Sequence, residues 1–487
     1  MSDVTSSTAT LPAQRYKRCP TCDRLTPADS MRCYECWNDV ASVPILEATA
    51  ASRALARQQQ IDGALLARRA TSARRIQRLK QASLAVFAAV TAWYGYWTFI
   101  YQPPPVALGT RPTLQLVAGP DVWAIDAGDA GGTRTTAALT AATEASTTAW
   151  TRELGASPVG PLIASASLVY AALEDGRIVA LDVRTGTPAW THQLPNHPVA
   201  GPTLAGDRLY VPQIAGRLLV LDATTGTPLL ESPAATTSFT TSPLVADGIA
   251  YIFGSGQLLA FDATSGARLW SHPIASNWAF VTPVLSGPHI AVATGNRTLI
   301  FDRLAGQQTY YYEFERAQPF SIVVADDTIY TLSARFGAAI DVDSRRPWWE
   351  SGRAYWNQLW IWSMAPEPPP PPSIWVTRRP ARDGFPAAVA ADRLRVAGAE
   401  GDLRALSRAD GTPLWQVRTP PIAGAPTLAA DGLLVVHAQS LALYDAGDGH
   451  LLSERPLGGD ADLDSAIVTS HGTYALAKDG RLTALRR

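Results

Sequence analysis

The sequence is organised by a motif that recurs about every forty residues. The clearest copy, residues 257–270, reads as an apolar strand, a turn with Asp262 and Gly266, and a second strand with Trp270. Seven further sets keep its offsets of four and eight residues: Ala142/Ser146/Trp150, Asp182/Gly186/Trp190, Asp222/Gly226/Leu230, Asp302/Gly306/Tyr310, Asp341/Arg345/Trp349, Ser407/Gly411/Trp415 and Asp445/Gly449/Ser453. A period of this length predicts one repeat architecture rather than several unrelated domains.

Each unit reads as four short antiparallel strands. In the unit that ends at His272, apolar runs near residues 241–246, 249–254, 257–261 and 267–272 are bounded by Gly and Asp. The Asp can accept backbone N–H groups, the Gly supplies a positive φ, and the aromatic ring can cover the seam to the next sheet. Four strands in forty residues predict the blade of a β-propeller, so the main domain is expected to be all-β.

The number of blades depends on how the chain ends are treated. Seven complete copies run from about residue 158 to 457, and residues 465–485 supply only three further strands. A strand at 148–154, which carries Trp150, could be the missing fourth strand. We therefore expect an eight-bladed ring closed by joining the chain ends, with seven blades as the alternative. Residues 112–141 are left over as a partial sheet or cap.

All four cysteines lie near the N-terminus, as Cys19, Cys22, Cys33 and Cys36. Two Cys-x-x-Cys pairs ten residues apart can bring four thiolates to one tetrahedral Zn²⁺ with no position left open. The pattern predicts a structural zinc ribbon at 15–40, after a disordered tail at 1–14. A redox dithiol is the alternative, but it normally uses one such pair on a thioredoxin-like fold.

A basic stretch precedes an uncharged one in the middle of the N-terminal part. Residues 46–80 favour helix and carry eight basic side chains, and residues 82–101 carry no formal charge. Twenty residues at ~1.5 Å each match a ~30 Å hydrocarbon core. The aromatic end of the stretch and the basic flank predict a single transmembrane helix with the N-terminus in the cytoplasm and the propeller outside. Residues 102–111 then form a Pro-rich linker to the propeller at 112–487.

The Leu-Asp-x-x-Thr-Gly-x-x-x-Trp frame, as in residues 181–190, resembles the pyrroloquinoline-quinone (PQQ)-type propeller repeat. The resemblance covers roughly residues 112–487, and it implies that the Trp-bearing strand is the outer one, docking each blade on the next. Enzymes of this family pair vicinal cysteines with a Ca²⁺ site of Glu, Asn and Asp. No cysteine follows Cys36, and no stretch matches those ligands, so we expect no PQQ and no catalytic residues. The chain is more similar to the non-enzymatic branch, such as the outer-membrane assembly lipoprotein, although it lacks a lipobox cysteine.

The remaining polar motifs are interpreted as structural. His192 and His272 both fall two residues after a repeat Trp, and the acidic run 460–464 lacks the Gly and Glu of a calcium loop, so we expect a solvated loop there. A Trp- and Pro-rich insertion at 351–383 is expected to pack on the propeller; the alternative is docking to a partner, a glycan or a membrane. The part after residue 110 is acidic (28 Lys+Arg against 35 Asp+Glu), which argues against nucleic acid.

The sequence therefore predicts a membrane-anchored propeller that binds or scaffolds protein or envelope partners. Two alternatives remain. One is a PQQ-dependent oxidoreductase. The other is a transmembrane sensor that couples a ligand of the propeller to a cytoplasmic partner of the zinc ribbon.

Overall fold

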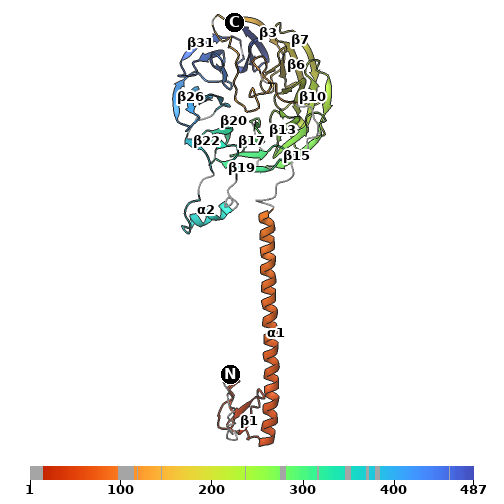
Figure 1. Ribbon diagram of the computed structural model, residues 1–487, viewed down its shortest axis with the longest axis vertical. Coiled ribbons are helices and arrows are strands. Elements are labelled where there is room, and N and C mark those ends of the chain that lie inside the picture. Colours follow the sequence, from red (N-terminus) through yellow and green to blue (C-terminus); the bar gives the residue numbers. More distant parts are fainter. Residues whose placement is uncertain are drawn as a thin grey trace, which may run out of the picture. The chain divides into compact units, whose positions relative to one another are not determined.

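The computed structural model describes residues 15–96, 114–117, 119–143, 145–235, 237–274, 281–314, 317–345, 352–368, 372–378, 384–459 and 461–487 (Figure 1). The chain divides into two compact units, Met1–Tyr101 and Gln102–Arg487. The predicted tail at 1–14, the last five residues of the predicted span and the linker at 102–111 lie outside the described residues.

The N-terminal unit is a small ribbon followed by one long helix. Strand β1 (Tyr16–Arg18) pairs antiparallel with β2 (Leu25–Pro27), and helix α1 runs from Ala48 to Gly95. The basic helix and the uncharged stretch that the sequence separates are thus one continuous helix up to Gly95. At ~1.5 Å per residue, its 48 residues extend over roughly 70 Å.

The uncharged part of α1 presents its large side chains to the surroundings. Phe87 is 70% exposed and Trp93 is 64% exposed, and Leu84, Val86, Val90 and Tyr94 are exposed as well. Within the described residues, no helix contains a segment long and apolar enough to cross a membrane.

The second unit is a ring of eight four-stranded antiparallel sheets, which confirms the predicted eight-bladed propeller (Figure 1). The first four blades comprise β4 (Ile163–Ala164), β5 (Leu168–Ala172), β6 (Arg177–Asp182), β7 (Pro188–Gln193); β8 (Thr203–Ala205), β9 (Arg208–Gln213), β10 (Arg217–Asp222), β11 (Pro228–Glu231); β12 (Leu244–Ala246), β13 (Ile249–Gly254), β14 (Gln257–Asp262), β15 (Arg268–Pro273); and β16 (Val284–Ser286), β17 (His289–Thr294), β18 (Arg297–Asp302), β19 (Gln308–Glu313). A 3₁₀ turn, η2 (Ile214–Gly216), links β9 to β10.

The last four blades follow the same order except where an insertion or the chain ends intervene. They comprise β20 (Pro319–Ala325), β21 (Thr328–Ser333), β22 (Phe336–Asp341), β23 (Trp375–Arg378); β24 (Ala388–Ala390), β25 (Arg393–Gly398), β26 (Asp402–Ser407), β27 (Pro413–Arg418); β28 (Thr427–Ala429), β29 (Gly432–Val436), β30 (Ser440–Tyr444), β31 (Leu451–Pro456); and β32 (Leu463–Thr469), β33 (Gly472–Ala477), β34 (Arg481–Arg486), β3 (Thr147–Glu153). Because β3 pairs with β34, the two ends of the propeller sequence close blade 8.

The repeated turn forms as its residues predict. In blade 1, the Asp182 Oδ1 accepts the backbone N–H groups of Arg184 and Thr185, both at 2.9 Å. Gly186 has φ 66°, and the register of β6 and β7 shifts by a bulge between Ala180 and Leu181. The turn therefore ends strand three, offsets strand four by one residue and places the repeat Trp on the outer strand.

The hydrophobic core lies between the blades rather than within one of them. One cluster joins Trp150 and Ile467 of blade 8 to Leu162 and Leu181 of blade 1, and equivalent clusters recur around the ring. Burial of these faces, at ~25 cal/mol per Å² of apolar surface, stabilises the ring only when all blades are present.

Residues 114–143, named the central segment, run through the ring and contact the innermost strands and their turns. Carbonyls of this segment accept backbone N–H groups from seven blades, at 2.7–3.0 Å: Leu114 from Gly248, Pro120 from Ser470, Ala124 from Leu204, Ala130 from Leu285, Gly131 from Val324, Thr133 from Val389 and Arg134 from Leu428. Trp123 forms a reciprocal bridge to Ala164 of blade 1. The leftover residues of the sequence are therefore neither a separate sheet nor an outer cap, because their backbone groups are paired with the ring's inner edge.

Candidate metal centre and binding elements

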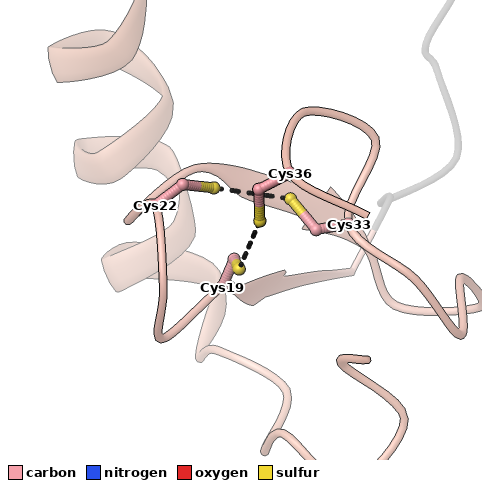
Figure 2. Close-up of side chains that lie close together, drawn as sticks. All are labelled: Cys19, Cys22, Cys33 and Cys36. Carbon is pink, nitrogen blue, oxygen red and sulfur yellow. Dashed lines mark hydrogen bonds between the residues drawn. The ribbon is translucent and has the colours of Figure 1, made fainter. Parts of the chain in front are cut away.

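The four cysteines of the ribbon come together at one point (Figure 2). The Sγ atoms of Cys19 and Cys36 lie 3.5 Å apart, as do those of Cys22 and Cys33, and all four Sγ atoms lie within 4.8 Å of one another. These separations are far longer than a disulfide bond. Four thiolates ~2.3 Å from a tetrahedral Zn²⁺ would be roughly 3.8 Å apart, so the donor set fits this ion.

The backbone around the cluster is arranged to stabilise negative sulfur. The N–H of Cys36 lowers the pKa of Cys33 to about 6, and the N–H of Thr21 lowers the pKa of Cys19. The N–H of Arg24 favours the Cys22 thiolate, but burial and the neighbouring thiols raise the pKa of Cys22 to about 12. Four thiols this close cannot all ionise without a cation, which is the electrostatic condition of a metal centre.

The ribbon is attached to the start of α1 by contacts that sequence reasoning missed. Arg24 forms an ion pair with Asp62 at 2.7 Å, and the backbone N–H of Leu25 donates to Gln58 Oε1 at 3.0 Å. Ala51 is buried. Gln58 and Asp62 lie four residues apart on one helix face, a spacing that could have indicated a docking surface. The cysteine knuckles and the first turns of α1 therefore form one unit.

The repeat tryptophans join each blade to the next, as the family resemblance implied. The indole N–H of Trp150 donates to the Val183 carbonyl at 3.2 Å, that of Trp190 to Ala223 at 3.1 Å and that of Trp270 to Arg303 at 3.1 Å. Each ring also lies against the positive-φ glycine of the next turn; a Cβ at Gly226 would lie 2.5 Å from Trp190. The repeated residues therefore have structural roles.

In blade 5 the repeat tryptophan is Trp375. The prediction that Trp349 fills this repeat position, together with Asp341 and Arg345, is therefore wrong. Trp375 opens the outer strand β23, its indole donates to the Arg408 carbonyl at 2.8 Å, and its ring packs on Gly411. The insertion thus lies between strands three and four of blade 5, ahead of Trp375, rather than after a finished blade. Trp349 was assigned to the repeat because it stands eight residues after Asp341, the spacing of the other copies. Trp349 itself lies outside the described residues.

The insertion contains a short helix, α2 (Arg353–Ile361), with an unusually apolar surface. Tyr355, Ile361, Trp362 and Met364 are each at least 60% exposed, and Trp360 is 43% exposed. The expectation that the aromatic residues of the insertion pack on the propeller therefore fails for these side chains. They form an exposed apolar patch of the kind that marks a contact site.

A buried arginine, which no sequence pattern indicates, holds the central segment together. The side chain of Arg134 is 4% exposed; its Nε donates to the Pro426 carbonyl at 3.0 Å and its Nη1 to the Asp126 carbonyl at 2.9 Å. The Asp126 carboxylate lies 3.6 Å away, and burial raises the pKa of Asp126. The guanidinium therefore ties blade 7 to the middle of the segment.

Other polar residues that the sequence singled out are structural, with one correction. His272 packs edge-on against Phe301 of the next blade at 5.0 Å, and burial lowers the pKa of His272 and of His192. In the acidic run, Asp464 is not solvated as expected: burial raises its pKa. The run enters blade 8 as strand β32, which draws Asp464 inward.

The potential metal ligands of the propeller gather at one turn of a late blade. Within the described part of the propeller, one group of three potential metal ligands gathers, namely Asp445, Asp448 and His450. They lie on the turn between β30 and β31, where Asp445 accepts the N–H of Gly447 as in the other repeat turns. No catalytic step is therefore assigned through a quinone.

Comparison with known structures finds the fold of the ring in BamB and in two dehydrogenases. BamB from Moraxella catarrhalis has a TM-score of 0.55 at 18% identity, over 70% of this chain and 98% of that one. The quinohemoprotein alcohol dehydrogenase from Comamonas testosteroni has 0.57 at 14% (75% and 80% covered), and a europium-containing methanol dehydrogenase has 0.56 at 11% (73% and 89% covered). Identities this low show the shared fold alone.

A comparison with curated protein sequences gives no match. The family model described as outer membrane protein assembly factor BamB, a PQQ-type repeat, matches residues 129–192, 174–351 and 338–487, and so covers most of the chain. The chain therefore belongs to this family of PQQ-type propellers.

Proposed function

We propose that the protein is a membrane-anchored, extracytoplasmic propeller that binds or scaffolds protein or envelope partners, and that its cytoplasmic ribbon holds a structural Zn²⁺. The observation that carries this proposal is the use of the repeated residues. Asp182, Gly186 and Trp190, with their counterparts, form turns and seams between blades. What distinguishes this chain lies outside the repeat, on the insertion and on the N-terminal unit. Membership of a family described as an assembly factor supports a binding role.

Affinity purification from solubilised membranes tests the binding role. The full chain is expected to retain specific proteins; removal of residues 352–368, which leaves strand β23 in place, separates partners of the insertion from partners of the propeller itself. The matched control is Gln416→Ala on the outer strand of blade 6, an exposed side chain far from the insertion in sequence. A propeller that retains nothing beyond an unrelated membrane protein would contradict the proposal.

The proposed anchor is the stretch at residues 82–101. It is supported by the exposed Leu84, Phe87 and Trp93 on α1 and by the absence of any acidic residue between Asp62 and residue 101. The basic residues before the stretch favour a cytoplasmic N-terminus and contact with anionic lipid. The chain should resist alkaline carbonate extraction, and external protease should digest the propeller but not the ribbon. Full extraction by carbonate would contradict the anchor.

The proposed zinc site rests on the four converging Sγ atoms of the ribbon. Purified chain should contain about one zinc per molecule, and Cys33→Ser should lower the content severalfold, because three ligands bind the ion far less tightly. Ser30→Ala, on the same loop but with no thiol, is the control. Purified chain without stoichiometric metal would overturn the assignment.

A PQQ-dependent oxidoreductase is the second candidate, because the solved structures of this fold include a quinohemoprotein alcohol dehydrogenase and a methanol dehydrogenase. Added PQQ and Ca²⁺ should then shift the quinone absorbance and support dye-linked alcohol oxidation. Neither change is expected, because no cysteine follows Cys36 and no stretch of the sequence matches the calcium ligands of such enzymes. A quinone spectrum that saturates at one equivalent would reverse this preference.

A transmembrane sensor is a third candidate, favoured by the docking of the ribbon on an uninterrupted α1. Loss of a propeller-dependent phenotype on deletion of residues 1–45 would support it. An unchanged phenotype would exclude it.

A further inference from the structure

The exposed face around α2 has a composition that selects its partner. No charged residue lies between Arg353 and Glu367. The exposed large apolar side chains of this stretch are Tyr355 (70%), Trp360 (43%), Ile361 (66%), Trp362 (60%) and Met364 (71%). Tryptophan and tyrosine are the residues that prefer the boundary between lipid headgroups and acyl chains. A short apolar helix with few directed polar groups suits a lipid surface.

The element is folded by its own contacts, so the aromatic face is available. The Trp356 indole donates to the Pro366 carbonyl at 2.8 Å, and the N–H of Met364 donates to the Leu359 carbonyl at 2.8 Å. These bonds turn the chain back after the helix ends, and the Trp356 side chain holds the returning segment against the helix. Trp360, Ile361 and Trp362 remain on the outside.

The proposed anchor supplies the reason for choosing lipid as the occupant. Residues 102–113 connect the predicted span to the propeller and can extend over at most roughly 40 Å. A propeller tethered this closely meets the bilayer at high effective concentration, so even a weak interfacial contact would be populated. The propeller part is acidic overall, with 28 basic against 35 acidic residues after residue 110. An anionic membrane therefore repels the uncharged aromatic element less than it repels the rest of the propeller surface.

We propose that the α2 element, residues 352–364, inserts the exposed side chains of Trp360, Ile361 and Trp362 into the outer interface of the membrane that anchors the chain. The propeller would then be held at two points, by the transmembrane helix and by α2. This inference rests on the proposed membrane anchor, and it names a bilayer, rather than a protein, as the partner of the insertion.

The test uses full-length chain reconstituted in vesicles of phosphatidylcholine and phosphatidylglycerol with no other protein. A specific protease site replaces residues 104–109 of the linker. After complete cleavage, flotation measures the fraction of propeller that stays with lipid. The cut propeller should remain bound, and the triple variant Trp360→Ser, Ile361→Ser, Trp362→Ser should lower its partition at least roughly tenfold. Gln358→Ala, an exposed polar position on the same helix, should change little.

Each outcome has a distinct meaning. Uncut chain that fails to float shows that the anchor itself is wrong, whereas floating uncut chain with full release after cleavage overturns only the α2 contact. Retention on native membranes but not on pure lipid vesicles assigns the face to a protein and also overturns the proposal. Because the three side chains are exposed, the variant should keep the thermal transition of the parent, which separates lost binding from lost folding.

Discussion

The propeller holds its eight blades in two different ways, one at the rim and one in the centre. At the rim, four of the repeat tryptophans each donate to a carbonyl of the next blade and pack on its glycine, so the same small contact is made several times. In the centre, the central segment contacts all eight blades without repeating any residue. Loss of one rim contact weakens one seam, whereas loss of one central contact affects the whole ring.

The largest expected effect is therefore at Arg134. Its replacement by Ala removes two hydrogen bonds to carbonyls and leaves the Asp126 carboxylate without its cation. A hydrogen bond to a charged group typically contributes about 1.5–3 kcal/mol, so loss of the two bonds from Arg134 should lower the unfolding free energy by roughly 3 kcal/mol or more. Urea unfolding measures the loss, with the exposed Arg418→Ala as control, which should stay within about 0.5 kcal/mol of the parent. A loss no greater than that of the control would show that the centre does not hold the ring.

A rim glycine should come next. At Gly226, φ is 71° and an added Cβ would meet the Trp190 ring at 2.5 Å. Gly226→Ala should therefore cost about 1 kcal/mol for the left-handed backbone and about 1–3 kcal/mol more for the clash. Gly287→Ala is the matched control, because Gly287 has φ 50° and open space around its Cα. Equal losses of unfolding free energy for the two variants would mean that the Trp190 ring can move aside to accommodate the added methyl group.

A smaller loss of unfolding free energy is expected when the hydrogen bonds between neighbouring blades are removed. The Ala223 carbonyl accepts both the Trp190 indole N–H and the Tyr170 hydroxyl, each at 3.1 Å. Trp190→Phe and Tyr170→Phe should each cost about 1 kcal/mol. The double variant should cost more than their sum, because the carbonyl then has neither donor. Strict additivity would show that water replaces these bonds freely.

The same contrast explains how far the sequence predicts the fold. The rim is readable because the Asp turn, the positive-φ Gly and the Trp are encoded within ten residues and recur, so each copy supports the others. Blade closure by the Trp150 strand was predictable for that reason. The central segment was not, because its pairing uses backbone groups that any residue carries, with partners up to 350 residues away in sequence. Arg134 shows no pattern that distinguishes it from a surface arginine.

The candidate sites divide in the same way. The cysteine cluster is local, with two knuckles of fixed spacing, and the structure brings all four Sγ atoms together. Its attachment through Arg24 and Asp62 joins residues 38 apart and was missed. The Trp375 frame was missed because the insertion separates it from Asp341, while Trp349 offered a false match at the expected spacing. A site whose residues lie close together in sequence can thus be predicted from the sequence, whereas contacts between residues far apart in sequence cannot.

The smallest of the four predicted stability effects is that of acid. It distinguishes the rim from the centre because the pKa values of Asp182 and Asp464 are shifted in opposite directions. Backbone and side-chain donors from Thr185 lower the pKa of Asp182, so its contribution to stability is present above about pH 4 and fades as the pH falls through its folded pKa. Burial raises the pKa of Asp464, and repulsion by Asp126 adds to this. The folded protein therefore favours protonated Asp464, whose contribution falls as the pH rises from about 4 through its folded pKa.

Substitution by asparagine turns this difference into a measurement. At pH 7, Asp464→Asn should raise the unfolding free energy, because it removes a buried charge, whereas Asp182→Asn should lower it. The Asp464 difference should shrink as the pH falls to about 4, because its carboxyl is then protonated in the folded chain. The Asp182 difference should shrink only at lower pH, because the folded pKa of Asp182 lies below its ordinary value. Urea titrations at several pH values follow both. A destabilised Asp464→Asn at pH 7 would mean that the carboxylate has a cationic partner in the folded ring and that the centre tolerates charge as well as the rim does.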